Sequence, residues 1–514
     1  YDYTPRAGEP AILPRSPRVV VATLLGITNA VTYYSYTTNA FGDIVETNER
    51  AASAGSAFGS ANNQKTVTTR LGGVGSLFQG RPVTLLLPAG RQQTYDYSIG
   101  SYTTNGAPGG GSFYTNPAGT CLRTILIHGN AANPNGLANK STSEVTVENR
   151  LGQVLKQETY VYTGSGYDPV GWTEHTRDVF GHITDTYKSD GTHVQTGWGC
   201  CGKESEVDGF GEETSYFYDE LQRLEISVKQ GIAAGAYPEQ ADIYSQYSYD
   251  GCGRQLTRSV SAGALSQISS NSYDLAGRPI KSSDFAGLLT EYAYTNGGRT
   301  VTAILPGGFT RVTESFLDGR TKSVTGTGQV SEYHDYGVNA DGALWETVYS
   351  SSNGSPVWVK TTTDLLGRSW KVEKPGYLAT ETSENFYNTL GQLIKTTTSG
   401  QADTLFVYDE LGNQIRSGLD INSNGVLDLA STDRISETDT SYLSAASEWF
   451  LQTVSKVYAV DNSATPLTNS VSRQQLTGLG GGMLSVASSF DFLGNETVTT
   501  TTVDPANKKV TQTT

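Results

Sequence analysis

The sequence is poor in charged side chains, in cysteine and in long apolar runs, and each shortage excludes a class of protein. Charged residues make up 17% of the 514 residues, and the formal net charge is −15. Because no basic stripe is present to neutralise phosphates, we expect no nucleic-acid partner. Four cysteines are too few for the disulfide framework of a small secreted domain. No apolar run reaches the ~18 residues that cross a bilayer, so we expect no membrane span in this segment.

The residues that are abundant point to one fold class. The chain contains 58 glycines and 30 tyrosines, together with many threonines and serines. Threonine, tyrosine and valine fit a pleated surface, whereas glycine serves the turns between strands. The composition therefore predicts an all-β protein.

A short pattern, Asp or Asn followed by two residues and Gly, recurs through the chain after a Tyr-x-Tyr strand. Good copies are "YSYDGCGRQL" and "NSYDLAGRPI", while "YFYDELQRLEIS" carries Gln222 where Gly is usual. Half-steps also occur, from Asp208 to Asp219 and from Asp274 to Asp284. The turn positions that we single out are Asp219, Asp250, Gly253, Asp274, Gly277, Asp364, Gly367, Asn388, Gly391, Asp409 and Gly412.

Each copy is readable as one structural unit. Tyr-x-Tyr places two rings on the same face of a strand. The Asp or Asn side chain can bond backbone N–H groups of the turn, and the Gly supplies its positive φ. A single hairpin cannot bury its rings, but stacked copies can, so the pattern predicts one long coiling sheet of stacked hairpins rather than several globular lobes.

The repeat Y-D-x-x-G-R followed by an aliphatic residue or Pro resembles the YD repeat of the RHS family. The resemblance is strongest from Tyr33 to Leu419 and returns weakly at Asp491 to Glu496. It implies a spiralling β-sheet that forms a shell or solenoid-like wall, as in bacterial RHS toxins, toxin-complex shells and teneurins. In the toxin branch such a shell encloses a polypeptide effector.

The resemblance and the composition together predict three regions. Residues 1–32 form a Pro-rich strap and entry strand, 33–430 the YD-repeat shell, and 431–514 a degenerate continuation of the repeat. Because the chain opens at Tyr1 rather than Met, we expect it to be a fragment of a longer protein. RHS toxins close the shell with a D-P-x-x-G-L segment, whose near match here is "YDPVGWTEH" (Tyr167 to His175). It lies in mid-chain and lacks the Leu, so we expect a Pro-containing turn there instead.

One loop has the spacing of a calcium site. In "DINSNGVLD" the residues at positions 1, 3, 5, 7 and 9 are Asp420, Asn422, Asn424, Val426 (through its carbonyl) and Asp428. This is EF-hand spacing through position 9, with a Gly at the sharp turn. Ser431 stands where a bidentate Glu is expected, so calcium affinity should be modest. The alternative is an Asn/Asp/Gly-rich hairpin loop without an ion.

Two adjacent cysteines, Cys200 and Cys201, suggest a vicinal disulfide in a tight turn. The alternatives are reduced thiols, or zinc ligands shared with His175, His182 and His193 just upstream. The zinc alternative is disfavoured because neither C-x-x-C nor H-x-x-x-H spacing is present.

No motif for nucleophilic or metal-dependent catalysis is present, so we expect the protein not to be an enzyme. We expect a structural protein, extracellular or at the cell surface, whose wall encloses, displays or adheres. One alternative is an adhesin module that binds a cell-surface glycan or protein. Another is the shell part of a polymorphic toxin whose effector lies outside this chain. Open sheet edges also allow self-assembly into filaments.

Overall fold

The computed structural model describes residues 1–4, 9, 17–73, 77–232, 239–445, 448–476, 483–504 and 509–514. Its 38 strands form one sheet. Each strand pairs antiparallel with the next in the chain, except that β6 pairs with both the short β7 and β8. The prediction of an all-β, spiralling sheet of stacked hairpins is confirmed. Most of the predicted strap at the N-terminus lies outside the described residues.

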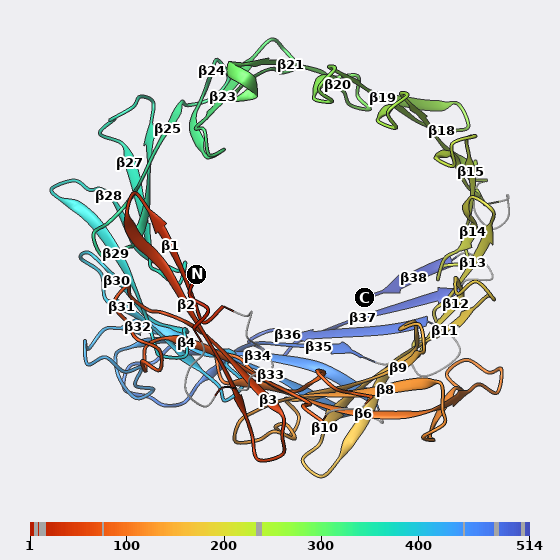
Figure 1. Ribbon diagram of the computed structural model, residues 1–514, viewed down its shortest axis with the longest axis horizontal. Helices are drawn as coiled ribbons and strands as arrows, with labels where there is room; N and C mark the ends of the chain where they lie inside the picture. Colours follow the sequence, from red (N-terminus) through yellow and green to blue (C-terminus); the bar gives the residue numbers. More distant parts are fainter. Residues whose placement is uncertain are drawn as a thin grey trace.

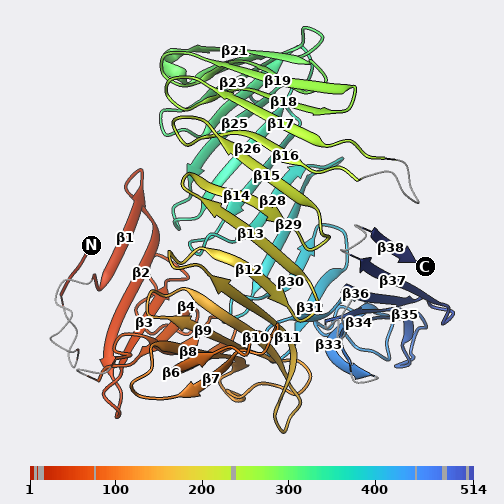
Figure 2. The ribbon, with the colours of Figure 1, turned by 90° about the vertical axis from the view of Figure 1, so that its right-hand side faces the viewer.

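The sheet follows a ring when viewed down its shortest axis, and its second circuit meets the first (Figures 1 and 2). We call β1–β24 the first coil and β25–β38 the second coil. The first coil comprises β1 (Val19–Leu24), β2 (Ile27–Thr38), β3 (Ile44–Arg50), β4 (Gln64–Arg70), β5 (Pro82–Leu86), β6 (Arg91–Thr103), β7 (Ser112–Thr115), β8 (Cys121–Asn130), β9 (Thr142–Asn149), β10 (Val154–Tyr162), β11 (Tyr167–Arg177), β12 (Ile183–Lys188), β13 (His193–Gly199), β14 (Gly202–Val207), β15 (Glu213–Tyr218), β16 (Leu224–Lys229), β17 (Ile243–Tyr249), β18 (Gln255–Ala262), β19 (Leu265–Tyr273), β20 (Pro279–Ser283), β21 (Leu289–Thr295), the 3₁₀ turn η1 (Asn296–Gly298), β22 (Thr300–Ile304), β23 (Thr310–Ser315) and β24 (Thr321–Gly326).

The second coil comprises β25 (Glu332–Val338), β26 (Leu344–Ser350), β27 (Trp358–Thr363), β28 (Ser369–Pro375), β29 (Thr380–Tyr387), β30 (Leu393–Thr398), β31 (Asp403–Tyr408), β32 (Gln414–Asp420), β33 (Arg434–Ala445), β34 (Glu448–Tyr458), β35 (Leu467–Gln475), β36 (Met483–Phe490), β37 (Glu496–Asp504) and β38 (Lys509–Thr513). No pairing joins β38 to β1 among these strands, so the sheet is not closed. Within the described ranges, no helix has the length and hydropathy to cross a membrane.

Sequential antiparallel pairing places alternate turns on opposite edges of the sheet. One edge, which we call the inserting edge, carries the turns that follow β2, β4, β9 and each later odd-numbered strand up to β33. The opposite edge, which we call the receiving edge, carries the turns that follow β1, β3, β5, β8 and each later even-numbered strand. This alternation explains the half-steps of the repeat. Asp219 and Asp274 turn at the inserting edge, whereas Asp208 and Asp284 turn at the receiving edge.

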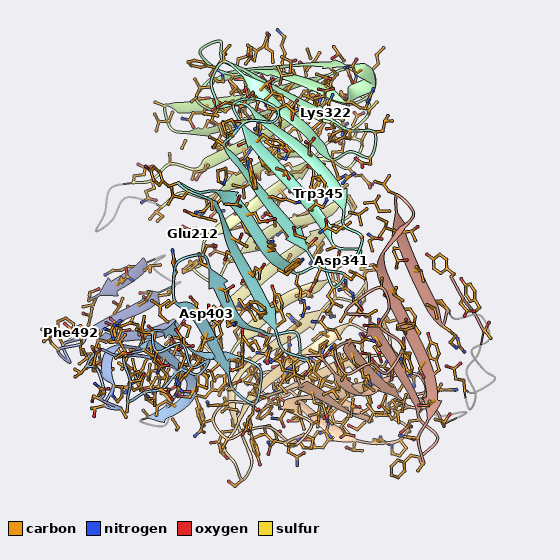
Figure 3. All side chains as sticks on the ribbon, turned by 90° about the vertical axis from the view of Figure 1, so that its left-hand side faces the viewer. Glu212, Lys322, Asp341, Trp345, Asp403 and Phe492 are labelled. Atoms are coloured by element: carbon orange, nitrogen blue, oxygen red, sulfur yellow. The ribbon has the colours of Figure 1, made fainter. Side chains whose placement is uncertain are left out.

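The two coils meet where inserting-edge turns of the second coil stack on receiving-edge turns of the first. A Cβ atom built at Gly342, in the β25–β26 turn, would lie 2.2 Å from the carbonyl oxygen of Thr28, at the start of β2 next to the β1–β2 turn. Figure 3 shows the neighbouring Asp341 beside the N-terminal strands. Further along, a Cβ at Gly412 would lie 3.2 Å from the carbonyl oxygen of Ala89. Close stacking at this seam therefore leaves little room for a side chain at the turn glycines.

Polar contacts and a small apolar cluster continue the seam. Asn130 Nδ2 donates to the carbonyl oxygen of Glu410 at 3.0 Å, and Lys140 Nζ pairs with Asp439 Oδ1 at 3.1 Å. The partners in these two contacts lie 280 and 299 residues apart in the chain, and Arg91 and Asn413, which also bond across the seam, lie 322 apart. One circuit of the ring therefore takes about that length. The apolar cluster consists of Val161, Val170 and Trp449, with Tyr442 and Leu476 packed against it. Coil-on-coil contact thus buries apolar surface that a single antiparallel layer would leave in water.

The segment "YDPVGWTEH" is a strand rather than the turn we expected. Tyr167 to His175 lies within β11, and Pro169 pairs opposite Tyr160. The register shifts there, between Thr159 and Tyr160. A proline is accommodated in a sheet at such an irregularity, because the missing N–H is not needed by a regular ladder. The prediction of a turn was therefore wrong.

Candidate functional site

The repeat turns share one hydrogen-bonding arrangement, which Asp250 illustrates. Its Oδ1 accepts the backbone N–H groups of Cys252 and Arg254, both at 2.9 Å, and its Oδ2 accepts Arg254 Nε at 2.6 Å. The backbone N–H of Arg254 is the main cause that lowers the pKa of the Asp250 carboxyl. Gly253 closes the turn with a φ of 82°. The Asx-type turn and its glycine therefore follow from local chemistry alone.

The arginine of each turn also ties one unit to the next. Arg254 Nη1 donates to the carbonyl oxygen of Asp274 at 3.2 Å, and its guanidinium lies 4.8 Å from the ring centroid of Tyr273. Tyr273 in turn donates its hydroxyl to the carbonyl oxygen of Gln255 at 3.1 Å. The same cation–π contact recurs at Arg223 with Tyr249, Arg278 with Tyr294, Arg320 with Tyr336 and Arg368 with Tyr387. The repeated Tyr, Asp and Arg thus link neighbouring units at intervals between Arg223 and Tyr387, a role for the arginine that the sequence reasoning missed.

The other predicted turn positions have the same geometry. In each, the Asp or Asn side-chain oxygen accepts the N–H groups two and four residues later, and each predicted glycine has a φ between 79° and 83°. These turns are Asp219, Asp274 with Gly277, Asp364 with Gly367, Asn388 with Gly391, and Asp409 with Gly412. Their polar groups are directed at their own backbone, which indicates a structural use.

Gln222 adopts the left-handed conformation in place of the usual glycine, with a φ of 62°. This conformation costs a non-glycine residue about 1 kcal/mol. We therefore expect Gln222→Gly to raise the midpoint of urea unfolding, equivalent to a stabilisation of about 0.5–1 kcal/mol. Gly253→Ala is the matched control and should lower the midpoint by a similar amount. An unchanged or lower midpoint for Gln222→Gly would contradict this account of the turn.

The loop from Asp420 to Asp433 brings together the predicted calcium ligands. Asp428 Oδ2 accepts Asn424 Nδ2 at 2.6 Å and Asn422 Nδ2 at 3.4 Å. Asp420 is buried, and its two oxygens accept the backbone N–H groups of Asn424 and Gly425. Val426, whose carbonyl is the fifth predicted ligand, has an exposed side chain at the tip of the loop. The amide oxygens of Asn422 and Asn424 accept the backbone N–H groups of Asn424 and Val426. In the described part of the chain, no group of three or more His, Cys, Asp or Glu side chains is arranged to hold a metal.

Asp433 holds this loop closed from beyond the predicted ligands. Its buried carboxylate accepts the backbone N–H groups of Ile421 at 2.9 Å, Asn422 at 3.4 Å and Asp428 at 3.0 Å. Burial opposes the charge, but these N–H groups and the Ser431 hydroxyl outweigh it, so the pKa of Asp433 is lowered. Asp433 lies outside the ligand spacing of the motif, and its capping role depends on the folded loop.

The two adjacent cysteines lie at the β13–β14 turn. Their sulfur atoms are 3.0 Å apart and both thiols are free, with Cys200 exposed. The vicinal disulfide therefore stays a prediction. The nearby histidines have separate partners: His175 contacts Thr186 Oγ1, His182 pairs with Asp178, and His193 pairs with Asp185.

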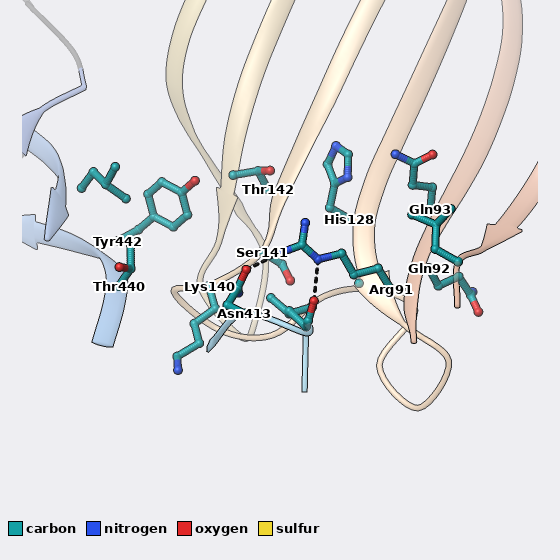
Figure 4. A pocket seen from close by; sticks show the side chains of 14 residues that line it. Arg91, Gln92, Gln93, His128, Lys140, Ser141, Thr142, Asn413, Thr440 and Tyr442 are labelled. Atoms are coloured by element: carbon teal, nitrogen blue, oxygen red, sulfur yellow. Dashed lines mark hydrogen bonds between the residues drawn. The ribbon is translucent and has the colours of Figure 1, made fainter. Parts of the chain in front are cut away.

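A pocket of about 520 Å³ lies at the seam between the coils (Figure 4). Arg91 crosses it from the first coil and donates through Nε to the carbonyl oxygen of Leu411 at 2.5 Å and through Nη2 to Asn413 Oδ1. Amide, hydroxyl and imidazole groups line much of the remainder, with the ring of Tyr442 on one side; Leu87, Lys140 and Leu451 complete the lining. These polar lining residues are Gln92, Gln93, His128, Ser141, Thr142 and Thr440.

Comparison with known proteins gives structural likenesses only. No family model and no curated protein matches the sequence. The crystal structure of TcdB2-TccC3 aligns with 95% of this chain and 35% of its own length, at 10% identity and a TM-score of 0.27. The Photorhabdus luminescens Tc holotoxin pore aligns over 93% of this chain and 34% of its own, at 10% identity and a TM-score of 0.22. The chain thus spans about a third of the length of these structures, and TM-scores this low carry no inference about family or function.

Proposed function

We propose that this chain is a wall segment of the RHS/YD-repeat type, a structural protein rather than an enzyme. It would work outside the cell or at its surface, where the coiled sheet encloses or displays another polypeptide. The observation that carries this proposal is the seam, at which turns of the second coil stack on the first. The repeated contacts among Tyr, Asp and Arg support it, because these polar side chains are already bonded within and between the turns.

Electron microscopy of the protein in its native polypeptide tests the wall proposal. We expect the coils to continue into a wall that surrounds a protected volume, with density for a polypeptide inside it. Such density would favour the toxin-type alternative, in which the effector lies outside this chain. An open sheet with nothing enclosed would contradict the enclosing role and leave display or adhesion.

The seam pocket supports a second candidate, the binding of a cell-surface glycan. Tyr442 offers an aromatic face, and Gln92, Gln93 and Thr142 offer paired donors and acceptors, a combination that suits sugar rings. Titration with a glycan library would test it, with Gln93→Ala as the variant that keeps the seam contacts of Arg91. Binding that is weakened in this variant would support the candidate, and binding that is unchanged would reject the pocket as its site.

We also propose that a calcium ion binds the loop from Asp420 to Asp428 and holds it in one conformation. The closeness of Asn422, Asn424 and Asp428 side chains supports this, although Asp420 already accepts two N–H groups. Because a bidentate carboxylate is missing at position 12, binding should need about 0.1–1 mM calcium, in the extracellular range.

Addition of about 1 mM calcium is expected to raise the unfolding temperature and slow proteolysis within the loop. Asp428→Ala should abolish both effects, since it removes the carboxylate that faces the two asparagines. Asp409→Ala, in a repeat turn outside the loop, is the matched control and should retain them. An equal response to magnesium, or no response to calcium in the unsubstituted protein, would reject the calcium proposal.

A further inference from the structure

The inserting edge carries a row of apolar side chains at one fixed turn position. The residue two places after the turn Asp or Asn is Phe41, Leu151, Phe180, Leu221, Leu366, Leu390 or Leu411. At other inserting-edge turns the preceding position is apolar instead, as at Leu275 and Leu317. Alternate turns of a sheet lie about 10 Å apart along an edge. These side chains therefore form an apolar line along the edge, interrupted at the turns after β13, β17 and β21, which carry Cys200 and Cys201, Cys252, and Asn296 instead.

Burial of this line depends on whether another coil lies against it. Leu366 and Leu411, in the second coil, are 5% and 8% exposed because the first coil covers their turns. Phe180 and Leu221, at the same turn position in the first coil, are 82% and 68% exposed. Leu390, at the same position in the second coil, is 43% exposed and so lies between these two groups. Because the local sequence is equivalent, the exposure of this position follows how closely the neighbouring coil lies against each turn.

The receiving edge is also uncovered, both near the end of the first coil and along the second, and it carries large apolar side chains there. Phe309 lies in the β22–β23 turn of the first coil, and Tyr377 and Leu378 lie in the β28–β29 turn of the second. All three are exposed. Each molecule therefore presents a free inserting edge and a free receiving edge, which are the two surfaces that already pack together at its internal seam.

Scattered apolar side chains on a surface need no explanation, but a periodic row along one edge does. We propose that the uncovered inserting edge, marked by Phe41, Leu151, Phe180, Leu221, Leu275 and Leu317, docks on the receiving edge of a second copy of this chain. The new interface continues the internal seam and uses turn-on-turn packing rather than added strands. Because the two surfaces differ, the contact is head-to-tail and builds open stacks rather than closed dimers. The net charge of −15 on each copy opposes stacking, so salt should promote it.

Sedimentation velocity of the purified chain from about 1 μM to about 100 μM tests the proposal. We expect the mass to rise with concentration beyond that of a dimer, and more so at higher salt. The triple variant Phe180→Ser, Leu221→Ser, Leu275→Ser should weaken self-association about ten-fold or more while its urea midpoint stays unchanged, because these side chains are exposed.

The matched control replaces Phe217 and Ile268 with serine, since these exposed residues lie within strands, on the face of the sheet. This control should associate as the unsubstituted chain does. A chain that stays monomeric throughout would overturn the proposal and assign the edge to another segment or partner. Equal loss of association in the edge and face variants would overturn it too, because the contact would then not be specific to the edge.

Discussion

Trp449→Ala is expected to destabilise the protein by about 3–5 kcal/mol and to loosen the second coil from the first. Trp449 is buried in the seam cluster with Val161 and Val170, which belong to β10 and β11. Its removal leaves a cavity between the two coils, lined by Val161, Val170, Tyr442 and Leu476. Urea unfolding measures the loss of stability.

Hydrogen exchange shows whether the seam is the part that fails. The amide of Tyr442 donates to the carbonyl oxygen of Asn139 across the coils at 2.7 Å, so its protection reports seam contact directly. In Trp449→Ala this amide should exchange faster, while amides in the β17–β18 hairpin keep their protection. Phe217→Ala, at an exposed aromatic of the same sheet, is the control and should cost well under 1 kcal/mol. Equal effects of the two substitutions would contradict the role of the cluster.

Asp433→Ala is expected to cost about 3 kcal/mol and to release the loop from Asp420 to Asp428. The substitution removes an ionised acceptor and leaves the N–H groups of Ile421 and Asp428 without their partner at a buried site. Asp433→Asn keeps one acceptor oxygen and should cost less. Urea unfolding and proteolysis of the loop measure both effects, and equal stability of Asp433→Ala and the unsubstituted chain would contradict the capping role.

The same carboxylate gives a pH dependence with a defined sign. The pKa of Asp433 is lower in the folded protein than its usual value. Its stabilising contribution is therefore complete above the unfolded-state pKa of about 3.9 and is lost as the pH falls through the folded-state pKa. The difference in stability between the unsubstituted chain and Asp433→Asn should shrink as the pH is lowered from about 5 to about 2. A difference that stays constant over this range would show that ionisation of Asp433 is not involved.

The individual repeat turns were predictable because their structure is local. The sequence spacing of Asp250 and Gly253 is enough to set an Asx turn with a positive φ, and the structure has that turn. The all-β class followed from composition for the same reason. The ligand spacing in the loop after Asp420 was also readable, since it depends on nine consecutive residues.

The arrangement of the coils was not predictable from any local pattern. Leu221 and Leu366 occupy the same turn position, yet one is exposed and the other is buried. What separates them is the twist and curvature summed over many strands, which brings residues 280 to 322 positions apart into contact. The prediction of a turn at Pro169 was wrong for a related reason. Its conformation is set by pairing with β10 across an irregularity rather than by the turn preference of proline.

Disulfide trapping across the seam tests the coiled arrangement most directly. The backbone hydrogen bond of 2.7 Å from Tyr442 to Asn139 brings the two backbones into contact across the seam. In a chain whose four native cysteines are replaced by serine, Asn139→Cys with Tyr442→Cys should oxidise readily to an intramolecular bond, seen as faster migration on a non-reducing gel. Asn139→Cys with Thr361→Cys, a residue of β27, is the control and should not form the bond. If the seam pair stays reduced in folded protein, the second coil does not stack on the first and the account of the fold is wrong.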